Sequence, residues 1–241
     1  MSTSQATGQP RVAPGQHIRH HRSVLADIEK RTLIWMAGRL PRWVNSDHLT
    51  GLGAIAMVGT GVAFAAASLH PWTLLLVPPT LALNWFGDSL DGTVARVRKT
   101  QRPRYGYYVD HVVDVANVSI LFTGLALSGL LNPWIAAALL VAYLLLSAES
   151  FLATHALGVF RISFAGFGPS ELRILLSIGA LAVLVKPVVN PFGLGELPLF
   201  DVGGTVGALG MLGAFVMNAA RNTVALYRAE PLKKPDDATP R

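Results

Sequence analysis

Four aspartates lie in one short stretch of the sequence, spaced so that they fall on helix faces. Asp88 and Asp91 are three positions apart, and Asp110 and Asp114 are four positions apart. On an α-helix, each spacing puts both side chains on one face. Carboxylates gathered near a membrane repel one another unless a cation neutralises them, and Mg²⁺, Mn²⁺ or Ca²⁺ require such oxygen ligands. We therefore expect a site for divalent metal, with room for two ions that clamp a phosphoryl group.

The residues around these acids suit a phosphate-containing substrate. A glycine directly follows the second aspartate and another precedes the third by one helical turn, which leaves room for a nucleotide. An alanine and an arginine complete the first stretch, and a guanidinium matches phosphate oxygens. With an asparagine one turn before the first aspartate, the candidate nucleotide-binding residues are Asn84, Gly92, Ala95, Arg96 and Gly106. Acids near a helix end can also be solvated or bound to arginines, but two pairs on consecutive helices favour the metal site.

The composition predicts a helical membrane protein. Of the 241 residues, 51% are hydrophobic and 14% are charged, whereas an ordinary soluble domain is about a quarter charged. The apolar residues form long blocks between short polar stretches, the pattern of a polytopic protein. We expect an all-α fold with six transmembrane helices, at about 49–69, 72–84 with a polar extension, 107–131, 133–160, 170–186 and 206–227. Pro78 and Pro79 are expected to kink the second of these helices.

The remaining segments flank this membrane domain, which we place at residues 42–227. Residues 23–41 mix apolar and charged side chains and predict an amphipathic helix in the membrane interface, with Ser23 as a plausible N-cap. The polar tails at 1–22 and 228–241 are expected to be disordered.

The charge distribution predicts an orientation. The formal net charge is +6, with basic residues in the tails and beside the ends of apolar segments, which indicates anionic lipid headgroups and not nucleic acid. The segment 98–104, between the second and third spans, carries four Lys or Arg residues and no acid. With six spans, the positive-inside rule puts both termini and the aspartates on the cytoplasmic side of the cell (inner) membrane. The chain has no cysteine, which excludes a disulfide framework and a thiolate metal site.

The aspartate motif resembles the signature of the CDP-alcohol phosphotransferase (CDP-alcohol phosphatidyltransferase) family. That signature reads Asp-x-x-Asp-Gly-x-x-Ala-Arg, a linker, and then Gly-x-x-x-Asp-x-x-x-Asp. Every fixed position is filled here, by Asp88, Asp91, Gly92, Ala95, Arg96, Gly106, Asp110 and Asp114. The linker from Arg96 to Gly106 has nine residues, slightly more than the family pattern. The six-span topology and the interfacial helix agree with the family as well.

The resemblance implies a Mg²⁺- or Mn²⁺-dependent transfer in phospholipid biosynthesis with CMP as the leaving group. By position, Asp88, Asp91 and Asp110 would bind the metal ions, and Asp114 would act as the general base for the acceptor hydroxyl while lying near a metal. Gly92 and Arg96 would contact the CDP moiety. The partners implied are a CDP-activated substrate, membrane lipid and a second copy of the chain in a homodimer.

Ionisable residues in two later helices are candidates for an acceptor or lipid pocket. Glu149 and His155 lie in the fourth predicted span, where an ionisable group is a functional candidate, although Glu149 can equally pair with a neighbouring helix. Glu171 and Arg173 open the fifth span, and Arg161 precedes it. Capping explains much of the Glu171 segment, while the two arginines are candidates to hold a phosphate.

Two alternatives to phosphatidyl transfer from CDP-diacylglycerol stay open. His111, directly after Asp110, is typical of aminoalcohol phosphotransferases that use CDP-choline or CDP-ethanolamine with diacylglycerol, whereas the small size of the chain favours the CDP-diacylglycerol enzymes. A membrane metal-ion transporter would instead place acids near mid-membrane in several helices, with repeat symmetry between halves. We find no obvious repeat, and the acids cluster at one predicted membrane edge.

Overall fold

The structure is a computed structural model, and it describes residues 26–157, 169–193 and 195–232. Within these ranges the chain is almost entirely helical, as predicted. The helices are α1 (Ala26–Arg39), α2 (Ser46–Ala66), η1 (Pro71–Leu76), α3 (Val77–Val97), α4 (Pro103–Leu127), α5 (Pro133–Leu157), α6 (Pro169–Val185), η2 (Pro191–Gly193) and α7 (Leu199–Ala229). Two short strands, β1 (Val188–Val189) and β2 (Leu197–Pro198), pair antiparallel in the loop before α7.

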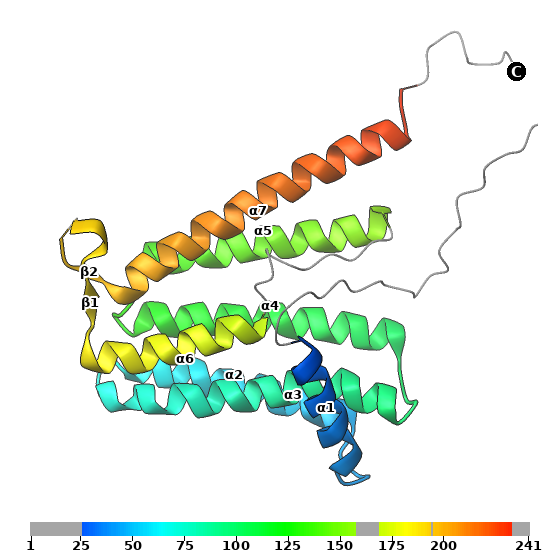
Figure 1. The fold of residues 1–241 in the computed structure, drawn as a ribbon, viewed down its shortest axis with the longest axis horizontal. Helices are drawn as coiled ribbons and strands as arrows, with labels where there is room; N and C mark the ends of the chain where they lie inside the picture. The colour runs from blue at the N-terminus through cyan, green and yellow to red at the C-terminus, as the bar shows by residue number, and fades with distance from the viewer. Residues whose placement is uncertain (1–25, 158–168, 194, 233–241) are drawn as a thin grey trace, which may run out of the picture.

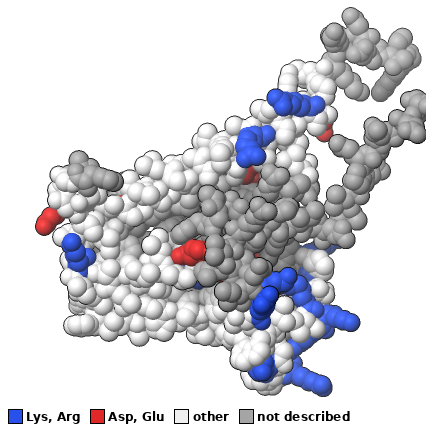
Figure 2. Space-filling view, viewed as in Figure 1, with Lys and Arg blue, Asp and Glu red and all other residues white. Residues whose placement is uncertain are grey.

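The long helices α2 to α7 lie roughly side by side, and α1 crosses one end of them (Figure 1). The connection from α3 to α4, the start of α1 and the end of α7 all lie at this end. Helix α2 packs most extensively on α3 and α4, while α5 packs on α7. Lys and Arg side chains gather mainly around the α1 end on the face that Figure 2 shows.

Glycines let α2 approach its two neighbours closely. A Cβ atom on Gly87 of α3 would lie 2.6 Å from the backbone nitrogen of Gly53, and one on Gly124 of α4 would lie 2.3 Å from the carbonyl oxygen of Gly61. Side chains larger than hydrogen cannot fit there, so the glycines let α2 pack closely on α3 near Gly53 and on α4 near Gly61. Gly51, on the same helix, has open space around it.

Helix α1 closes the end of the bundle. Leu33 and Ala37 are buried and form a small apolar cluster with Leu49 of α2 and with Leu90 and Val94 of α3. The opposite side of α1 is open, with Trp35 57% exposed. The interfacial location of this helix stays a prediction, and its expected N-cap, Ser23, lies outside the described residues.

The linker between α1 and α2 wraps around one arginine. The Arg98 guanidinium donates hydrogen bonds to the carbonyl oxygens of Leu40 at 2.9 Å and Pro41 at 3.1 Å, and also to that of Val44. The linker ends in Asn45, whose side chain accepts a hydrogen bond from the His48 backbone nitrogen at 2.9 Å and caps α2. Sequence patterning placed Arg98 in a basic loop and did not predict this contact.

Several boundaries differ from those expected. Pro78 and Pro79 do not kink a helix, because α3 begins at Val77 and both prolines lie in its first turn, where no donor is lost. Helix α7 begins at Leu199, before the expected residue 206, and runs to Ala229, so the first residues of the predicted C-terminal tail are helical. Gly204 lies inside α7 because its missing Cβ admits Leu131 and Ile135, both within 2.9 Å of where it would be. The rest of both predicted tails lies outside the described residues, except for residues 230–232.

Four helices in the described part of the chain are long and apolar enough to cross a membrane, which indicates a membrane protein. They are α2, α4, α5 and α7. The helices expected as the second and fifth spans are formed, as α3 and α6, but are not among these four. Helix α3 carries the first half of the aspartate motif, with two acids and an arginine. Helix α6 has 17 residues, with Glu171 and Arg173 near its start. Six spans therefore remain a prediction.

Candidate active site

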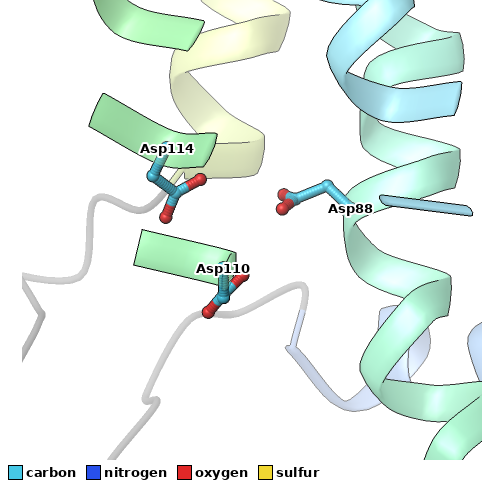
Figure 3. Close-up of side chains that lie close together, drawn as sticks. All are labelled: Asp88, Asp110 and Asp114. Carbon is cyan, nitrogen blue, oxygen red and sulfur yellow. The ribbon is translucent and has the colours of Figure 1, made fainter. Parts of the chain in front are cut away.

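Three of the four aspartates meet between α3 and α4. Asp88 extends from α3 toward Asp110 and Asp114, which stand one turn apart on α4 (Figure 3). One carboxylate oxygen from each residue lies within 4.8 Å of the others. The two acidic faces thus lie side by side, as their helical spacing predicted.

The contact between α2 and α3 sets the position of Asp88. Gly87, the preceding residue, abuts the backbone of α2, so α3 cannot rotate or slide there without a clash. One turn earlier, the fully buried Asn84 donates a hydrogen bond from Nδ2 to the Gly53 carbonyl oxygen at 2.9 Å. Packing and a buried hydrogen bond together fix the face of α3 that carries the first carboxylate.

The fourth predicted metal ligand, Asp91, is not part of the three-carboxylate group. Its Oδ2 accepts a hydrogen bond from the Thr50 hydroxyl at 2.6 Å, and its Oδ1 accepts one from the Gly92 backbone nitrogen at 2.5 Å. The Ser46 hydroxyl donates to the Asp91 carbonyl oxygen at 3.0 Å. This carboxylate is held toward α2, and its side chain must turn if it is to join the other three.

A small cavity lies among these acids. It is lined by residues of α2, α3 and α4, namely Thr50, Gly53, Ala54, Asn84, Asp88, Asp91, Asp110, Val113 and Asn117. Thr50 and Asn117 were not predicted from the sequence. Each is one of several polar residues in its helix, and only the packing of the helices shows that it faces the acids.

Arg173 of α6 reaches this group from the side. Its Nη2 donates to Asp88 Oδ2 at 2.6 Å, and its Nε donates to Asn84 Oδ1 at 2.8 Å. The Arg173 side chain is 14% exposed and that of Asp88 is 28% exposed. The sequence analysis named Arg173 as a phosphate-binding candidate, and the structure brings it to the carboxylates.

The predicted nucleotide-binding residues occupy different settings. A Cβ on Gly92 would lie 3.3 Å from Nη1 of Arg96, whose Nη2 donates to Thr93 Oγ1 at 3.0 Å. Ala95 is buried, whereas nothing surrounds the position of a Cβ on Gly106 within 4 Å. Gly92 therefore leaves room that the Arg96 guanidinium uses in this structure, and Gly106 opens onto free space.

The remaining pocket candidates are not gathered at the carboxylates. Glu149 Oε1 accepts a hydrogen bond from Asn222 Nδ2 at 2.6 Å, so it joins α5 to α7. His155 is exposed near the end of α5, Glu171 is partly buried in the first turn of α6, and Arg161 lies outside the described residues. The contact of Glu149 is the inter-helix pairing that the sequence analysis left open.

His111 is a packing residue between α4 and α5. It is 9% exposed, and its ring centroid lies 4.1 Å from that of Tyr107 and 4.8 Å from that of Phe151. Its Nδ1 is 2.7 Å from the Tyr107 carbonyl oxygen. These contacts give His111 a packing role between α4 and α5.

The family model for CDP-alcohol phosphatidyltransferases matches residues 43–220 of the chain. The chain belongs to this family. Among curated proteins, no sequence matches it. The match spans all four aspartates and the helices that position them, and it starts after α1. The protein is thus a phosphotransferase, and the CDP-alcohol phosphatidyltransferase signature lies on the two helix faces that form the carboxylate group.

The donor set of this CDP-alcohol phosphatidyltransferase fits a divalent metal. All the candidate ligand atoms are carboxylate oxygens, which Mg²⁺ and Mn²⁺ prefer. Two oxygens bound to one Mg²⁺ at about 2.1 Å lie at most about 4.2 Å apart. The three oxygens lie within 4.8 Å of one another, so small movements of their side chains would bring them to one ion. Arg173 forms an ion pair with Asp88 of this group.

Proposed function

We propose that the protein transfers a phosphatidyl group from CDP-diacylglycerol to an acceptor alcohol and releases CMP. The observation that carries this proposal is the meeting of Asp88, Asp110 and Asp114 on the signature helices of a CDP-alcohol phosphatidyltransferase. In this transfer the acceptor oxygen bonds to the phosphorus that carries the lipid, the bond from that phosphorus to the CMP oxygen breaks, and the acceptor proton is taken up.

We assign the metal site to Asp88, Asp110 and Asp114, with Asp91 as a further ligand after its carboxylate leaves Thr50. One or two Mg²⁺ or Mn²⁺ ions bound there would neutralise the diphosphate and stabilise the charge on the departing CMP. Repulsion between the carboxylates keeps their side chains from coming into direct contact, which leaves space between them for an ion.

We assign the general base to Asp114. It lies one turn further along α4 than Asp110. An acceptor hydroxyl within hydrogen-bond distance of its carboxylate would lose its proton to that oxygen as the new bond to phosphorus forms.

The substrate groups are assigned to two sets of residues around the carboxylates. We assign the CDP moiety to Asn84, Gly92, Ala95, Arg96 and Gly106, of which Gly106 opens onto free space. We assign an acceptor or lipid phosphate to Arg173, which donates hydrogen bonds to Asn84 and Asp88, two residues that line the cavity. Arg161 and Glu171 extend this assignment along the same segment, while the contact of Glu149 with Asn222 supports a structural role for Glu149. His155 stays a pocket candidate.

The site is proposed to lie at the cytoplasmic edge of the cell membrane, with six spans and both termini on that side. There a soluble nucleotide product and a bilayer lipid can meet. A homodimer, which the family resemblance implies, is part of the same proposal. Transfer from CDP-choline or CDP-ethanolamine to diacylglycerol is the second candidate, and His111 directly after Asp110 is the sequence feature that favours it. The transporter hypothesis lacks support, because the chain belongs to an enzyme family.

The test is CMP release by the purified protein in lipid nanodiscs with CDP-diacylglycerol, Mg²⁺ or Mn²⁺, and a panel of alcohols. We expect metal-dependent CMP formation with one alcohol, and a loss of at least about a hundredfold in Asp114→Asn, since a general base contributes roughly 10²–10⁴-fold. Glu196→Gln, a matched acid-to-amide change at an exposed loop position, should retain full activity. CMP release only from CDP-choline or CDP-ethanolamine with diacylglycerol would select the second candidate, and no release in either format would refute the proposed reaction.

A further inference from the structure

The first half of α6, which carries Arg173, has little apolar packing. The buried residues of this helix within the described part of the chain are Ala180 and Val183, both in its second half. Near the start of the helix, Ile174 is 50% exposed and Leu175 is 57% exposed. Apolar packing therefore holds the far end of α6, and polar contacts must hold the end beside the carboxylates.

One carboxylate of α1 supplies two of these contacts. Glu29 Oε1 accepts a hydrogen bond from Trp85 Nε1 of α3 at 2.7 Å and another from the Ser170 hydroxyl of α6 at 2.9 Å. These partners are 56 and 141 residues away along the chain. A hydrogen bond to an ionised carboxylate is stronger than one between neutral groups, so a single residue of α1 joins α3 to α6.

The Glu29 contacts stand directly next to those of Arg173. Trp85 follows Asn84 in α3, and Ser170 precedes Arg173 by one turn of α6. The pairing of α3 with α6 thus has two adjacent polar links. One runs through Glu29, and the other is the direct bond from Arg173 to Asn84 and Asp88.

We propose that Glu29 is a positioning residue, which holds the first turn of α6 against α3 so that Arg173 stays at Asp88. This inference rests on the proposed function, because it gives α1 a part in a site that lies otherwise on α2, α3, α4 and α6. It also gives the N-terminal helix a role besides lying against the membrane, although the family match begins after it.

The expected consequence can be measured without turnover. When Glu29 loses its carboxylate, the first turns of α6 lose their link to α1 and move more freely. Arg173 then spends less time at Asp88, which leaves more negative charge for a cation at the carboxylates. We expect Glu29→Ala to raise amide hydrogen exchange in residues 169–178 roughly tenfold and Mn²⁺ affinity roughly threefold, in line with couplings carried through packed networks.

The experiment compares variants by hydrogen exchange and by Mn²⁺ binding, followed by electron paramagnetic resonance, in nanodiscs. Glu29→Gln should behave as wild type, because its amide oxygen accepts the same two hydrogen bonds. Lys30→Ala, an exposed neighbour on α1, should also behave as wild type and is the matched control. In an Arg173→Gln background, Glu29→Ala should change Mn²⁺ affinity no further, because the residue through which it acts is absent.

Two results would overturn the inference: equal hydrogen exchange in Glu29→Ala and Lys30→Ala, or an effect of Glu29→Ala on Mn²⁺ affinity that persists in full without Arg173. If the protein released no CMP, only the proposed function would be refuted, because hydrogen exchange and Mn²⁺ binding can both be measured without the reaction. If wild-type protein bound no Mn²⁺, the proposed metal site would fail, and hydrogen exchange in residues 169–178 would still decide the role of Glu29.

Discussion

Arg173 places a positive charge beside a carboxylate that we expect to bind metal. Its guanidinium lies 2.6 Å from Asp88 Oδ2 and is mostly buried. A cation at the three-carboxylate group would be repelled by this charge, and the ion pair also occupies one of the oxygens that would bind the cation. Without a metal, however, the same pair lowers the cost of holding three acids together. Arg173 should therefore oppose metal binding and stabilise the metal-free protein.

The substitution Arg173→Gln tests this balance. We expect Mn²⁺ to bind roughly tenfold more tightly, a change of about 1.4 kcal/mol, because one repelling charge is removed. The metal-free variant should unfold at a lower temperature, and saturating Mn²⁺ should restore most of the loss. Thermal unfolding at a series of Mn²⁺ concentrations measures both effects. Arg221→Gln, an exposed arginine on α7, is the control. Weaker Mn²⁺ binding in Arg173→Gln would show that the arginine instead helps to arrange the metal ligands.

At the scale of the elements, the contact between α2 and α3 determines where Asp88 stands. A Cβ on Gly87 would lie 2.5 Å from the Leu49 carbonyl oxygen and 2.6 Å from the Gly53 nitrogen, both backbone atoms that cannot rotate away. One methyl group must therefore push the two helices apart. Because Asp88 is the next residue, such a shift changes the distance from its carboxylate to those on α4.

We predict that Gly87→Ala costs about 1–3 kcal/mol of stability, as overpacking does elsewhere, and reduces CMP release more than tenfold. Gly51→Ala is the matched control, since nothing lies within 4 Å of its added Cβ. Alanine in an open helical position should be neutral or stabilise by up to about 1 kcal/mol. Thermal unfolding and the nanodisc assay measure the pair. Equal behaviour of the two variants would contradict a structural requirement for glycine at position 87.

At the scale of the whole molecule, spacing in the sequence predicted which side chains share a helix face and which faces of consecutive helices meet. The positions of Asp110 and Asp114 on one face follow from their separation of four, and their meeting with Asp88 follows from a short connection between two helices. The bond from Arg173 to Asp88 joins residues 85 positions apart and depends on how α6 packs, which no local pattern contains. For the same reason the contacts of Glu29 were not predicted.

The errors in the predicted boundaries also have local causes. Paired prolines were taken to interrupt a helix, although they equally suit its first turn, and the choice depends on where η1 ends. The last predicted span was started at residue 206, although Gly204 lies inside α7 and admits the side chains of Ile135 and Leu139 of α5 to its surface. Glycine and proline have more than one structural use, and tertiary contacts decide between them.

The number of membrane crossings can be argued from the arrangement of α3 and α6. Helix α3 has 21 residues, or about 32 Å, and lies along α2, while α6 has 17 residues, or about 26 Å. A hydrocarbon core of about 30 Å is within reach of both, given the flanking polar residues. Figure 1 places the connection from α3 to α4 at the same end of the molecule as the end of α7. If all six helices cross, these two points share one side of the membrane, and the loop before α7 lies on the other.

Single cysteines test this topology cleanly, because the chain contains none of its own. We predict that a membrane-impermeant maleimide labels Thr100→Cys and Glu230→Cys from one side and Glu196→Cys from the other, in vesicles of known orientation. All three positions are exposed. If only α2, α4, α5 and α7 crossed, Thr100→Cys and Glu196→Cys would share a side, and Glu230→Cys would stand alone. Position 100 therefore decides between the two topologies: it shares a side of the membrane with position 230 if six helices cross and with position 196 if four cross. If position 100 lies on the cytoplasmic side, this would further support the proposal that the carboxylates meet a substrate from the cytoplasm, because they lie about two to three helical turns from this loop.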